Sequence, residues 1–208
     1  YEQVTDIQSK AFCGCTGMSS ISSYNPVPPA FAGDAFANVP KSCLLTVRAD
    51  YIETYRSSPW NNIFTMLPEE VKIGNLTYHL DAKDLWAYCT YYDGTETEVT
   101  VPANITVCGM DFMVYSAIGN VALNSRNILR KVNLPSTVTQ IGGFYGCTEL
   151  TEINFPDNLI HINNDAFTNC VKLGNPTIPA SVGFIGNNPY RGCTSITSIN
   201  VAEGNKAY

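Results

Sequence analysis

The feature that most constrains the fold of this chain is an internal repeat. A leading isoleucine recurs at Ile118, Ile141, Ile162 and Ile185, at intervals of 23, 21 and 23 residues. Apolar positions follow it at fixed spacing in each copy, and a fifth copy covers residues 7–21 at the start of the chain. A unit of this length cannot bury its own apolar face, so the copies must stack on one another. The repeat therefore predicts a solenoid.

Each copy is expected to contribute a short strand to a sheet that runs along the solenoid. In residues 150–155, Ile153 and Phe155 face one side and Asn154 the other, which is the alternation typical of a strand. Proline cannot donate to the next ladder bond, and it ends this strand in three copies, at Pro135, Pro156 and Pro179. The Ile-Gly step and the Ala-Phe-x-x-Cys stretch are expected to return the chain on the outer side, in irregular or short helical turns.

The composition excludes several classes of function. Charged residues make up only 14% of the 208 residues, and the net charge is -6 with a pI near 4.8. This balance argues against binding to nucleic acids or to anionic lipid, since both require Lys and Arg. Apolar residues reach 45%, which excludes a disordered polyelectrolyte. No run approaches the ~20 apolar residues of a membrane helix. The chain starts inside a repeat without a signal peptide, so we expect it to be a piece of a longer protein.

The repeat pattern resembles that of a known family. It reads I-G-x-x-A-F-x-x-C-x-x-L-x-x-I-x-L-P-x-x-V and resembles the BspA-type (treponemal) leucine-rich repeat of bacterial cell-surface proteins, over residues 118–203 and more loosely over residues 1–25. The resemblance implies an α/β-class leucine-rich-repeat solenoid that is β-rich with little helix. It would be a right-handed stack of short-strand coils with a hairpin N-cap and a helical C-cap element. The sequence departs from the family pattern where Arg126 replaces a cysteine, Pro176 replaces an apolar strand residue, and the coil of Ile141 is short.

The resemblance also implies that the chain holds parts of two arrays. Residues 1–66 would be the last repeat and C-terminal cap of one array, and residues 67–70 a linker. Residues 71–117 would form the β-hairpin N-cap of a second array, and residues 118–208 its truncated leucine-rich repeats. Terminal coils need such covers because an open end exposes apolar core and unpaired strand edges.

The residues of the first cap support a short helix. Asp50 followed by Glu53 is an N-terminal helix signature, and Pro59 disfavours helix at the residue before it. We therefore expect a helix from Tyr51 to Ser57. Three aromatic side chains would then cover the open end of the last coil, namely Tyr55, Trp60 and Phe64.

The second cap is predicted to be a pair of strands. They span residues 71–81 and 84–92, and Asp93-Gly94 marks a turn after them. Four aromatic residues of the second strand would suit an interface, but packing under the first coil is the favoured prediction. They are Trp86, Tyr88, Tyr91 and Tyr92.

Four of the eight cysteines occupy one column of the repeat, namely Cys15, Cys147, Cys170 and Cys193. Stacked coils would place them about 4.8 Å apart, but parallel side chains in a ladder rarely reach the torsion of a disulfide. The favoured prediction is a column of buried thiols that pack as small apolar groups. A disulfide between Cys89 and Cys108 across the opening hairpin stays open as an alternative.

The side-chain chemistry gives little support for an enzyme. The two histidines, His79 and His161, lie without a nucleophile motif around a partner residue. Cys13-Gly-Cys15 is an isolated pair, with no second close pair to complete a zinc site. The sequence has no Walker loop, dinucleotide fingerprint or calcium-binding loop. We therefore expect no catalytic residues, no metal and no cofactor.

The candidate ligand-binding residues form two polar columns on the strand face. One column holds Asn133, Asn154, Thr177 and Asn200, and beside it lie Lys131, Glu152, Asn175 and Ser198. The resemblance implies that this face is the concave surface, and solenoids bind partners along extended concave surfaces. An equally weighted alternative is that the asparagines only solvate the sheet and prevent lateral aggregation.

These features and the resemblance predict a non-enzymatic, extracellular adhesion module at the surface of a bacterium. Its expected partners are host extracellular-matrix or cell-surface proteins, with glycans and other bacterial cells as further candidates. Neither nucleic acid nor membrane insertion is expected. Weak polar contacts would add up over successive coils without a deep pocket. The alternative is a structural spacer that stiffens a longer surface protein and has no ligand of its own.

Overall fold

The computed structural model describes residues 3–117, 119, 121 and 125–205. Ile118 and Leu123 of the first copy of the second array, and Tyr208 at its end, lie outside these residues. The fold is mostly β, with short strands arranged in stacked coils, and the described residues contain a single short α-helix. Contacts within the chain define two compact units. Unit 1 comprises residues 1–71 and 80–85, and unit 2 comprises residues 72–79 and 86–208.

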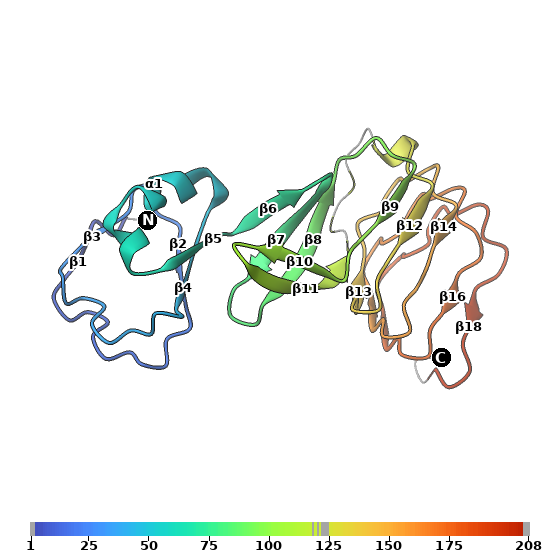
Figure 1. The fold of residues 1–208 in the computed structure, drawn as a ribbon. Helices are drawn as coiled ribbons and strands as arrows, with labels where there is room; N and C mark the ends of the chain where they lie inside the picture. Colours follow the sequence, from blue (N-terminus) through green and yellow to red (C-terminus); the bar gives the residue numbers. More distant parts are fainter. Residues whose placement is uncertain (1–2, 118, 120, 122–124, 206–208) are drawn as a thin grey trace. The chain divides into compact units, whose positions relative to one another are not determined.

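Unit 1 is built from short strands that pair in parallel as two small sheets (Figure 1). The first sheet pairs β1 (Asp6–Ile7) with β3 (Ala30–Phe31). The second has the order β2 (Ser20–Ser23), β4 (Leu44–Val47) and β5 (Thr65–Pro68).

Residues 30–47 form a coil that the repeat pattern missed. The Phe12 N–H donates to the Ala35 carbonyl oxygen at 2.8 Å, so Ala35-Phe36 continues the Ala-Phe column of the first coil. Phe36 follows Phe12 by 24 residues, close to the repeat period. The copy is hard to recognise in the sequence because Val39 stands where four other copies have a cysteine.

The cap helix begins differently from the prediction. Residues Ala49–Tyr51 form the 3-10 turn η1, and α1 covers Ile52–Arg56, inside the expected range. Asp50 makes no capping hydrogen bond, and its carboxylate instead pairs with Arg48 at 3.3 Å. A cap from Asp50 is not needed at this position, because the Ile52 N–H already donates to the Ala49 carbonyl oxygen within the 3-10 turn.

The three aromatic residues expected to cover the last coil of unit 1 are buried in its core. Trp60 lies in the 3-10 turn η2 (Pro59–Asn62), and its indole N–H donates to the Pro29 carbonyl oxygen at 2.7 Å. The ring of Phe36 lies 5.3 Å from the ring of Trp60 and 5.1 Å from that of Phe64. The missed coil therefore supplies the centre of this core.

A second group of strands forms an eight-stranded sheet, most of which lies in unit 2. The sheet order is β17 (Phe184–Ile185), β15 (His161–Ile162), β13 (Gln140–Ile141), β11 (Met110–Ala117), β8 (Trp86–Tyr92), β7 (Leu76–Asp81) and β6 (Glu70–Ile73), and β10 (Asn104–Val107) pairs antiparallel with β11. β11 is parallel to both β8 and β13, so the hairpin cap and the coils share one continuous sheet.

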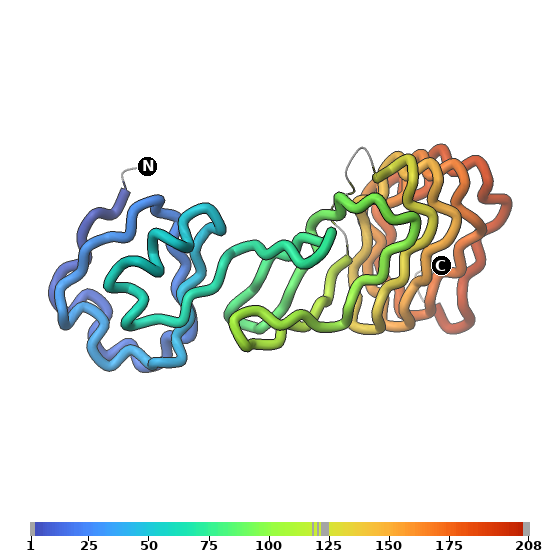
Figure 2. The backbone as a smooth tube through the Cα atoms, turned by 45° about the horizontal axis from the view of Figure 1, so that its top comes forward, coloured from blue at the N-terminus to red at the C-terminus, as the bar shows by residue number. Residues whose placement is uncertain are grey.

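The coils of unit 2 carry a further strand ladder. It consists of β9 (Glu98–Thr100), β12 (Lys131–Asn133) and β14 (Glu152–Ile153), followed by the separate pair β16 (Thr177–Ile178) and β18 (Asn200–Val201). The ladder is interrupted at Pro176, which has no N–H to donate. Figure 2 shows the coils of this unit stacked from yellow to red.

Each of these coils therefore has two strand positions, not the single one expected. The residue pairs that end in the leading isoleucines, such as Gln140–Ile141 and His161–Ile162, belong to the eight-stranded sheet in identical parallel register. The sequence offers only two residues for this strand in each coil, which is too short for its alternation to be recognised. The prediction of irregular turns was wrong at this position. The Ala-Phe-x-x-Cys stretches do form turns, and at the equivalent position of the first coil of unit 2 Ser125–Asn127 form a short 3-10 helix.

Left-handed backbone conformations recur in the outer turns. One column of residues with positive φ holds Gly14, Asn38, Gly146, Asn169 and Gly192. Glycine adopts this conformation without strain, and asparagine tolerates it better than other residues do. Beneath the turns, the rings of Phe144, Phe167 and Tyr190 stack at centroid distances of 5.5 Å, and neighbouring planes are within 7° of parallel.

The hairpin cap differs from the prediction in two places. Residues 71–81 are not one strand, because the chain reverses at Gly74, where φ is +59°, between β6 and β7. In the expected linker, residues 67–70, only Glu69 lies between β5 and β6, and its N–H donates to the Val47 carbonyl oxygen at 2.7 Å. Backbone pairing on a sheet thus replaces the free connection.

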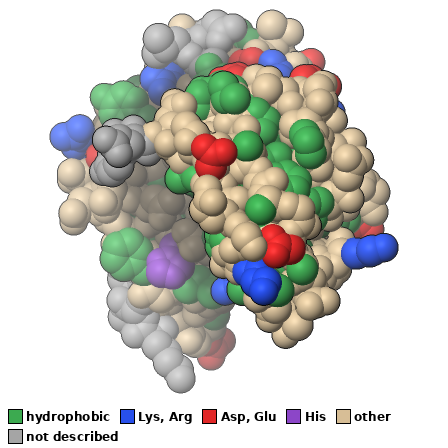
Figure 3. Space-filling model, turned by 90° about the vertical axis from the view of Figure 1, so that its left-hand side faces the viewer, with side chains coloured by type: hydrophobic (Ala, Val, Ile, Leu, Met, Phe, Trp, Pro, Cys, Tyr) green, Lys and Arg blue, Asp and Glu red, His purple; other side chains and the backbone are tan. Residues whose placement is uncertain are grey.

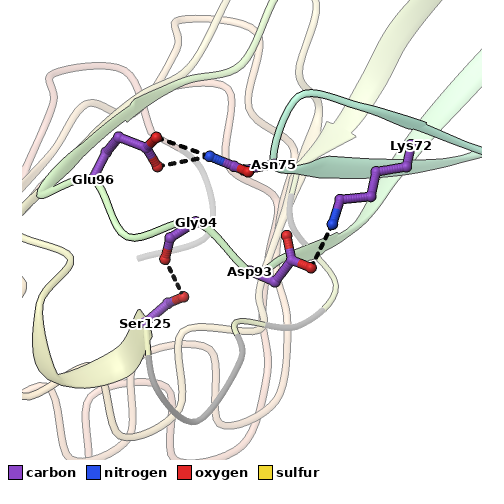
Figure 4. A network of polar contacts seen from close by, with 6 residues as sticks. All are labelled: Lys72, Asn75, Asp93, Gly94, Glu96 and Ser125. Atoms are coloured by element: carbon purple, nitrogen blue, oxygen red, sulfur yellow. Dashed lines mark hydrogen bonds and ion pairs between the residues drawn. The ribbon is translucent and has the colours of Figure 1, made fainter.

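The segment after β8 is an extended connection and not the predicted turn at Asp93-Gly94. Side chains hold it in place (Figure 4). Asp93 accepts from Lys72 at 2.7 Å, and Glu96 accepts two hydrogen bonds from the Asn75 amide at 2.8 and 2.9 Å. The buried Ser125 hydroxyl, in the 3-10 turn η3 (Ser125–Asn127), donates to the Gly94 carbonyl oxygen at 2.6 Å.

Candidate functional site

The predicted binding columns lie on the outward side of β12, β14, β16 and β18, and we call this surface the polar strand face. The register places Lys131 beside Glu152 and Thr177 beside Asn200. Val132 and Ile178, which alternate with these residues, are buried in the core. The structure thus brings the predicted side chains together on one surface. The members of this face are Lys131, Asn133, Glu152, Asn154, Asn175, Thr177, Ser198 and Asn200.

The two charged members of the polar strand face are paired. Lys131 Nζ lies 2.7 Å from Glu152 Oε1, and this hydrogen bond raises the pKa of Lys131. Lys131 is half-buried and Glu152 is exposed, so solvent screens the pair and it contributes little to stability. It leaves the face close to neutral.

Two asparagines of this face hold neighbouring coils together. Asn154 Oδ1 accepts from the Leu134 N–H at 2.7 Å, and its Nδ2 donates to the Leu134 carbonyl oxygen at 2.9 Å. Asn175 Oδ1 accepts from the backbone N–H groups of Thr197 and Ser198 at 2.8 and 3.1 Å. These amides replace ladder bonds that the backbone does not make, which is a structural role.

The other members have more freedom to meet a ligand. Asn133 Nδ2 donates to Thr100 Oγ1 at 3.2 Å, a single exposed contact. The side chains of Thr177 and Asn200 are exposed and make no hydrogen bond within the described part of the chain. The sequence pattern treated all four asparagine and threonine positions alike, because periodicity does not reveal which amides reach a backbone group.

The cysteine column is buried only in unit 2. Cys147, Cys170 and Cys193 are buried, whereas Cys15 is exposed because no described coil precedes it. The prediction that these thiols pack as apolar groups was incomplete. The Cys170 thiol donates to the Phe144 carbonyl oxygen at 3.0 Å, and the Cys193 thiol makes the same bond to Phe167.

The environment of these thiols suppresses their ionisation. A hydrogen bond with Cys147, followed by burial, raises the pKa of Cys170. Burial and the neighbouring Cys170 raise the pKa of Cys193 to about 11. Of the pair considered for a disulfide, Cys89 is buried in β8 and Cys108 is exposed, and each of the eight cysteines is a thiol in the structure.

The aromatic residues of β8 do not all pack into the core. Tyr92 is 1% exposed, as core packing predicts, but Trp86 is 38% exposed and Tyr91 is 36% exposed. The rings of Trp86 and Tyr88 lie 4.9 and 4.6 Å from the ring of Tyr115. The prediction of core packing was therefore wrong for Trp86 and Tyr91, the two exposed members of the group, whereas Tyr88 is half-buried.

The histidines take part in ring contacts rather than in polar clusters. His79 lies 5.8 Å from the Tyr88 ring, and His161 lies 5.6 Å from the Phe184 ring. In the described ranges, no group of three or more His, Cys, Asp and Glu side chains could hold a metal ion. Helices in those ranges are all too short to cross a bilayer. Figure 3 shows one face of the molecule, on which the charged side chains are scattered among hydrophobic and uncharged groups.

The repeated coils match a known family. The model of the BspA type leucine rich repeat region matches six copies in residues 1–62 and 116–207. The chain belongs to the BspA-type leucine-rich repeat family. The six copies include the coil of unit 1 that the sequence pattern missed. Leucine-rich repeats of this kind are generally protein-interaction modules, and the described site residues give no indication of catalysis.

Solved structures of bacterial leucine-rich repeat proteins resemble this BspA-type chain. One from Bacteroides capillosus ATCC 29799 is 27% identical, with a TM-score of 0.54, and the match covers 64% of this chain and 99% of that one. A leucine rich cell surface protein from Faecalibacterium prausnitzii A2-165 is 25% identical, with a TM-score of 0.52, and the match covers 66% of this chain and 44% of that one. Among proteins of curated function, no significant match was found.

Proposed function

We propose that this BspA-type chain is an extracellular adhesion module of a bacterial surface protein, and that it binds a protein partner through the polar strand face. The observation that carries the proposal is the row of exposed, uncharged side chains at Thr177 and Asn200, repeated at the same position in successive coils. The Faecalibacterium relative, described as a cell surface protein, supports the location. Host matrix and cell-surface proteins are the proposed partners.

The mechanism is the addition of many weak contacts. Each coil presents amide and hydroxyl groups about 4.8 Å from those of the next, so an extended partner surface meets several of them at once. The buried backbone of the face is already hydrogen-bonded, which leaves the side chains as the recognition elements. Because the Lys131–Glu152 pair neutralises itself, recognition would depend little on salt.

The test is binding of the folded chain to immobilised matrix proteins and mucins. A Thr177→Arg/Asn200→Arg variant places bulky charge on the face and leaves the structural Asn154 and Asn175 intact. The matched control is Thr194→Arg/Asn187→Arg, which makes the same exchange at exposed positions outside the face. Loss of binding in the first variant alone, with equal thermal unfolding, is the expected result. Equal binding by both variants would contradict the proposal.

A structural spacer is the second candidate function. The observation that favours it is the use of Asn154 and Asn175 to tie one coil to the next, which stiffens the stack. A spacer would bind none of the immobilised matrix proteins and mucins. Absence of binding by the unmodified chain to every protein tested would therefore favour this second function.

A further inference from the structure

A groove of about 650 Å³ lies in unit 2, away from the polar strand face. It follows the segments that connect the two strand ladders, just before β13, β15 and β17. Its wall includes Met113 of β11, and the other lining residues are Ser136, Thr137, Thr139, Asn158, Ile160 and Ser181. Successive coils therefore contribute equivalent positions along its length.

Three of the four hydroxyl groups that line the groove, those of Thr137, Thr139 and Ser181, donate their protons to backbone carbonyl oxygens. Thr137 Oγ1 donates to the Val114 carbonyl oxygen at 2.6 Å, and Ser181 Oγ donates to that of Leu159 at 2.6 Å. Thr139 Oγ1 donates to the Tyr115 carbonyl oxygen at 3.3 Å. A hydroxyl has one proton and two lone pairs, so these oxygens can only accept a further bond. The groove therefore offers acceptors to a ligand.

The amide in the groove is oriented in the same way. Asn158 Nδ2 donates one of its two protons to the Ser136 carbonyl oxygen at 3.2 Å, so the amide presents its Oδ1 as an acceptor and one further N–H to a ligand. No lining residue carries a charge. A groove of unit 1, by contrast, is lined by Arg48, Asp50, Glu69 and Glu70. An uncharged, acceptor-rich wall complements a neutral ligand that is rich in hydroxyl donors, and it disfavours anions.

The groove also has an apolar part. Ile160 is 44% exposed and Met113 is 36% exposed, although both are large hydrophobic residues. Met113 lies opposite Trp86 in the sheet, and the Trp86 ring is supported by the ring of Tyr115 at 4.9 Å. An exposed ring held in place by a neighbour is a flat apolar surface with little conformational freedom to lose on binding.

We propose that this groove binds a neutral oligosaccharide. A sugar chain presents hydroxyl donors on the edges of its rings and apolar C–H groups on their faces. The donors match the acceptors of the groove, and the C–H groups match the exposed Met113 and Ile160 side chains, with Trp86 beside Met113 in the sheet. Repeated sugar units meet repeated coils. The proposal excludes sulfated glycans, because the lining of the groove holds no positive charge to pair with their anionic oxygens.

The experiment is calorimetric titration of the 208-residue chain with cellohexaose, xylohexaose and mannohexaose, with a heparin hexasaccharide as the anionic probe. Ser136→Trp fills the groove from an exposed position, and Ser195→Trp makes the same exchange in an exposed outer turn. At least one neutral hexasaccharide is expected to bind. Ser136→Trp should weaken it at least about tenfold, whereas Ser195→Trp leaves it unchanged.

Two further variants test whether the sugar binds in this groove and not elsewhere on the chain. Met113→Ala/Ile160→Ala removes only exposed apolar surface, so it should weaken binding while thermal unfolding stays the same. Thr177→Arg/Asn200→Arg should bind the sugar normally, which separates this groove from the polar strand face. Absence of binding by all neutral hexasaccharides at millimolar concentration, tighter binding of the heparin hexasaccharide, or normal binding by Ser136→Trp would overturn the proposal.

Discussion

At the scale of single residues, the cysteine column shows how one side chain serves both packing and hydrogen bonding. Cys170 and Cys193 fill small spaces between coils and also satisfy the carbonyl groups of Phe144 and Phe167. Each of these carbonyl oxygens also accepts a backbone N–H, from Cys147 and Cys170 respectively, so the thiol occupies its second lone pair.

The first prediction concerns thiol reactivity. Cys13, Cys15 and Cys108 are exposed and should react rapidly with Ellman's reagent in the folded protein. The other five cysteines are buried, and the raised pKa values of Cys170 and Cys193 lower their thiolate fraction further. We expect these five to react only after unfolding. Rapid modification of any of them, identified by mass spectrometry, would contradict the structure.

The second prediction separates structural from exposed asparagines. Asn154→Ala removes two bonds to the Leu134 backbone, so the free energy of unfolding should fall by about 1–3 kcal/mol. Asn200→Ala is the control and should change it by less than about 0.5 kcal/mol, as is usual for surface positions. Chemical denaturation measures both values. Equal effects of the two changes would show that the Asn154 amide does not bridge the coils.

The third prediction concerns stability at high pH. Burial and the contact with Glu96 raise the pKa of Tyr92 to about 12, above its ordinary value near 10. Between these values the unfolded chain releases the tyrosine proton and the folded chain keeps it, so the free energy of unfolding should fall as pH rises. Tyr92→Phe should make this fall less steep. An unchanged slope would assign the alkaline loss to other groups, such as the buried Tyr78, whose pKa is also raised.

At the scale of the structural element, close contact between coils restricts the residue that follows the leading isoleucine Ile185. A Cβ atom on Gly186 would lie 2.4 Å from the backbone nitrogen of Asn164, and the backbone there cannot move aside without breaking the ladder. Gly183, three residues earlier, has nothing within 4 Å of the same atom.

The fourth prediction uses these two glycines. Gly186→Ala should destabilise the protein by about 1–3 kcal/mol, the usual cost of forcing extra atoms into a packed site. Gly183→Ala should be neutral, or stabilising by about 0.4–1 kcal/mol, because it restricts the unfolded chain. Midpoints of urea denaturation distinguish the two variants. A neutral Gly186→Ala would show that the coils can move apart there.

The elements also show which parts of the fold can be predicted from the sequence. The stacked coils and the alternation of Val132 and Asn133 follow from spacing, because burial of one strand side imposes it. The two-residue strands, such as His161–Ile162, could not be recognised, because their pairing depends on the coil beside them. The prediction that Asp50 caps the helix was wrong for a similar reason. The preceding 3-10 turn already supplies a hydrogen-bond acceptor for the N–H of Ile52 at the helix start.

The candidate site was harder to predict than the fold. Spacing placed Asn133, Thr177 and Asn200 on one surface, but it could not show that Asn154 bonds to the backbone. The groove was not predicted, because its residues lie in the connections between strands and in β11 and share no single residue type. Their positions do recur: Thr137, Asn158 and Ser181 lie four positions before a leading isoleucine, and Thr139 and Ile160 lie two positions before one.

At the scale of the whole molecule, charge contributes little to stability. Each of the five ion pairs among the described residues has at least one partner that is half-exposed or more. Exposed pairs are worth about 0–1 kcal/mol each, and the net charge of -6 adds a weak repulsion that salt would relieve. Apolar packing and backbone ladders therefore carry the fold.

The fifth prediction follows from this balance. Between about 0.02 and 0.5 M NaCl, we expect the Tm to change by less than about 4 °C, because screened attraction and screened repulsion offset each other. Differential scanning calorimetry measures the change. A much larger fall in Tm would indicate that ion pairs stabilise the molecule more than their exposure suggests.

The identical register of Ile141, Ile162 and Ile185 along one sheet has a consequence for how such chains vary. When one whole coil is inserted or deleted, the chain ends that are joined already have the same backbone geometry. The strand residues on either side therefore keep their buried and exposed faces. A shift of one residue would instead turn every strand side chain over. Gain or loss of a whole coil is therefore the change in length that disturbs this fold least, and the length of the protein can vary by single coils.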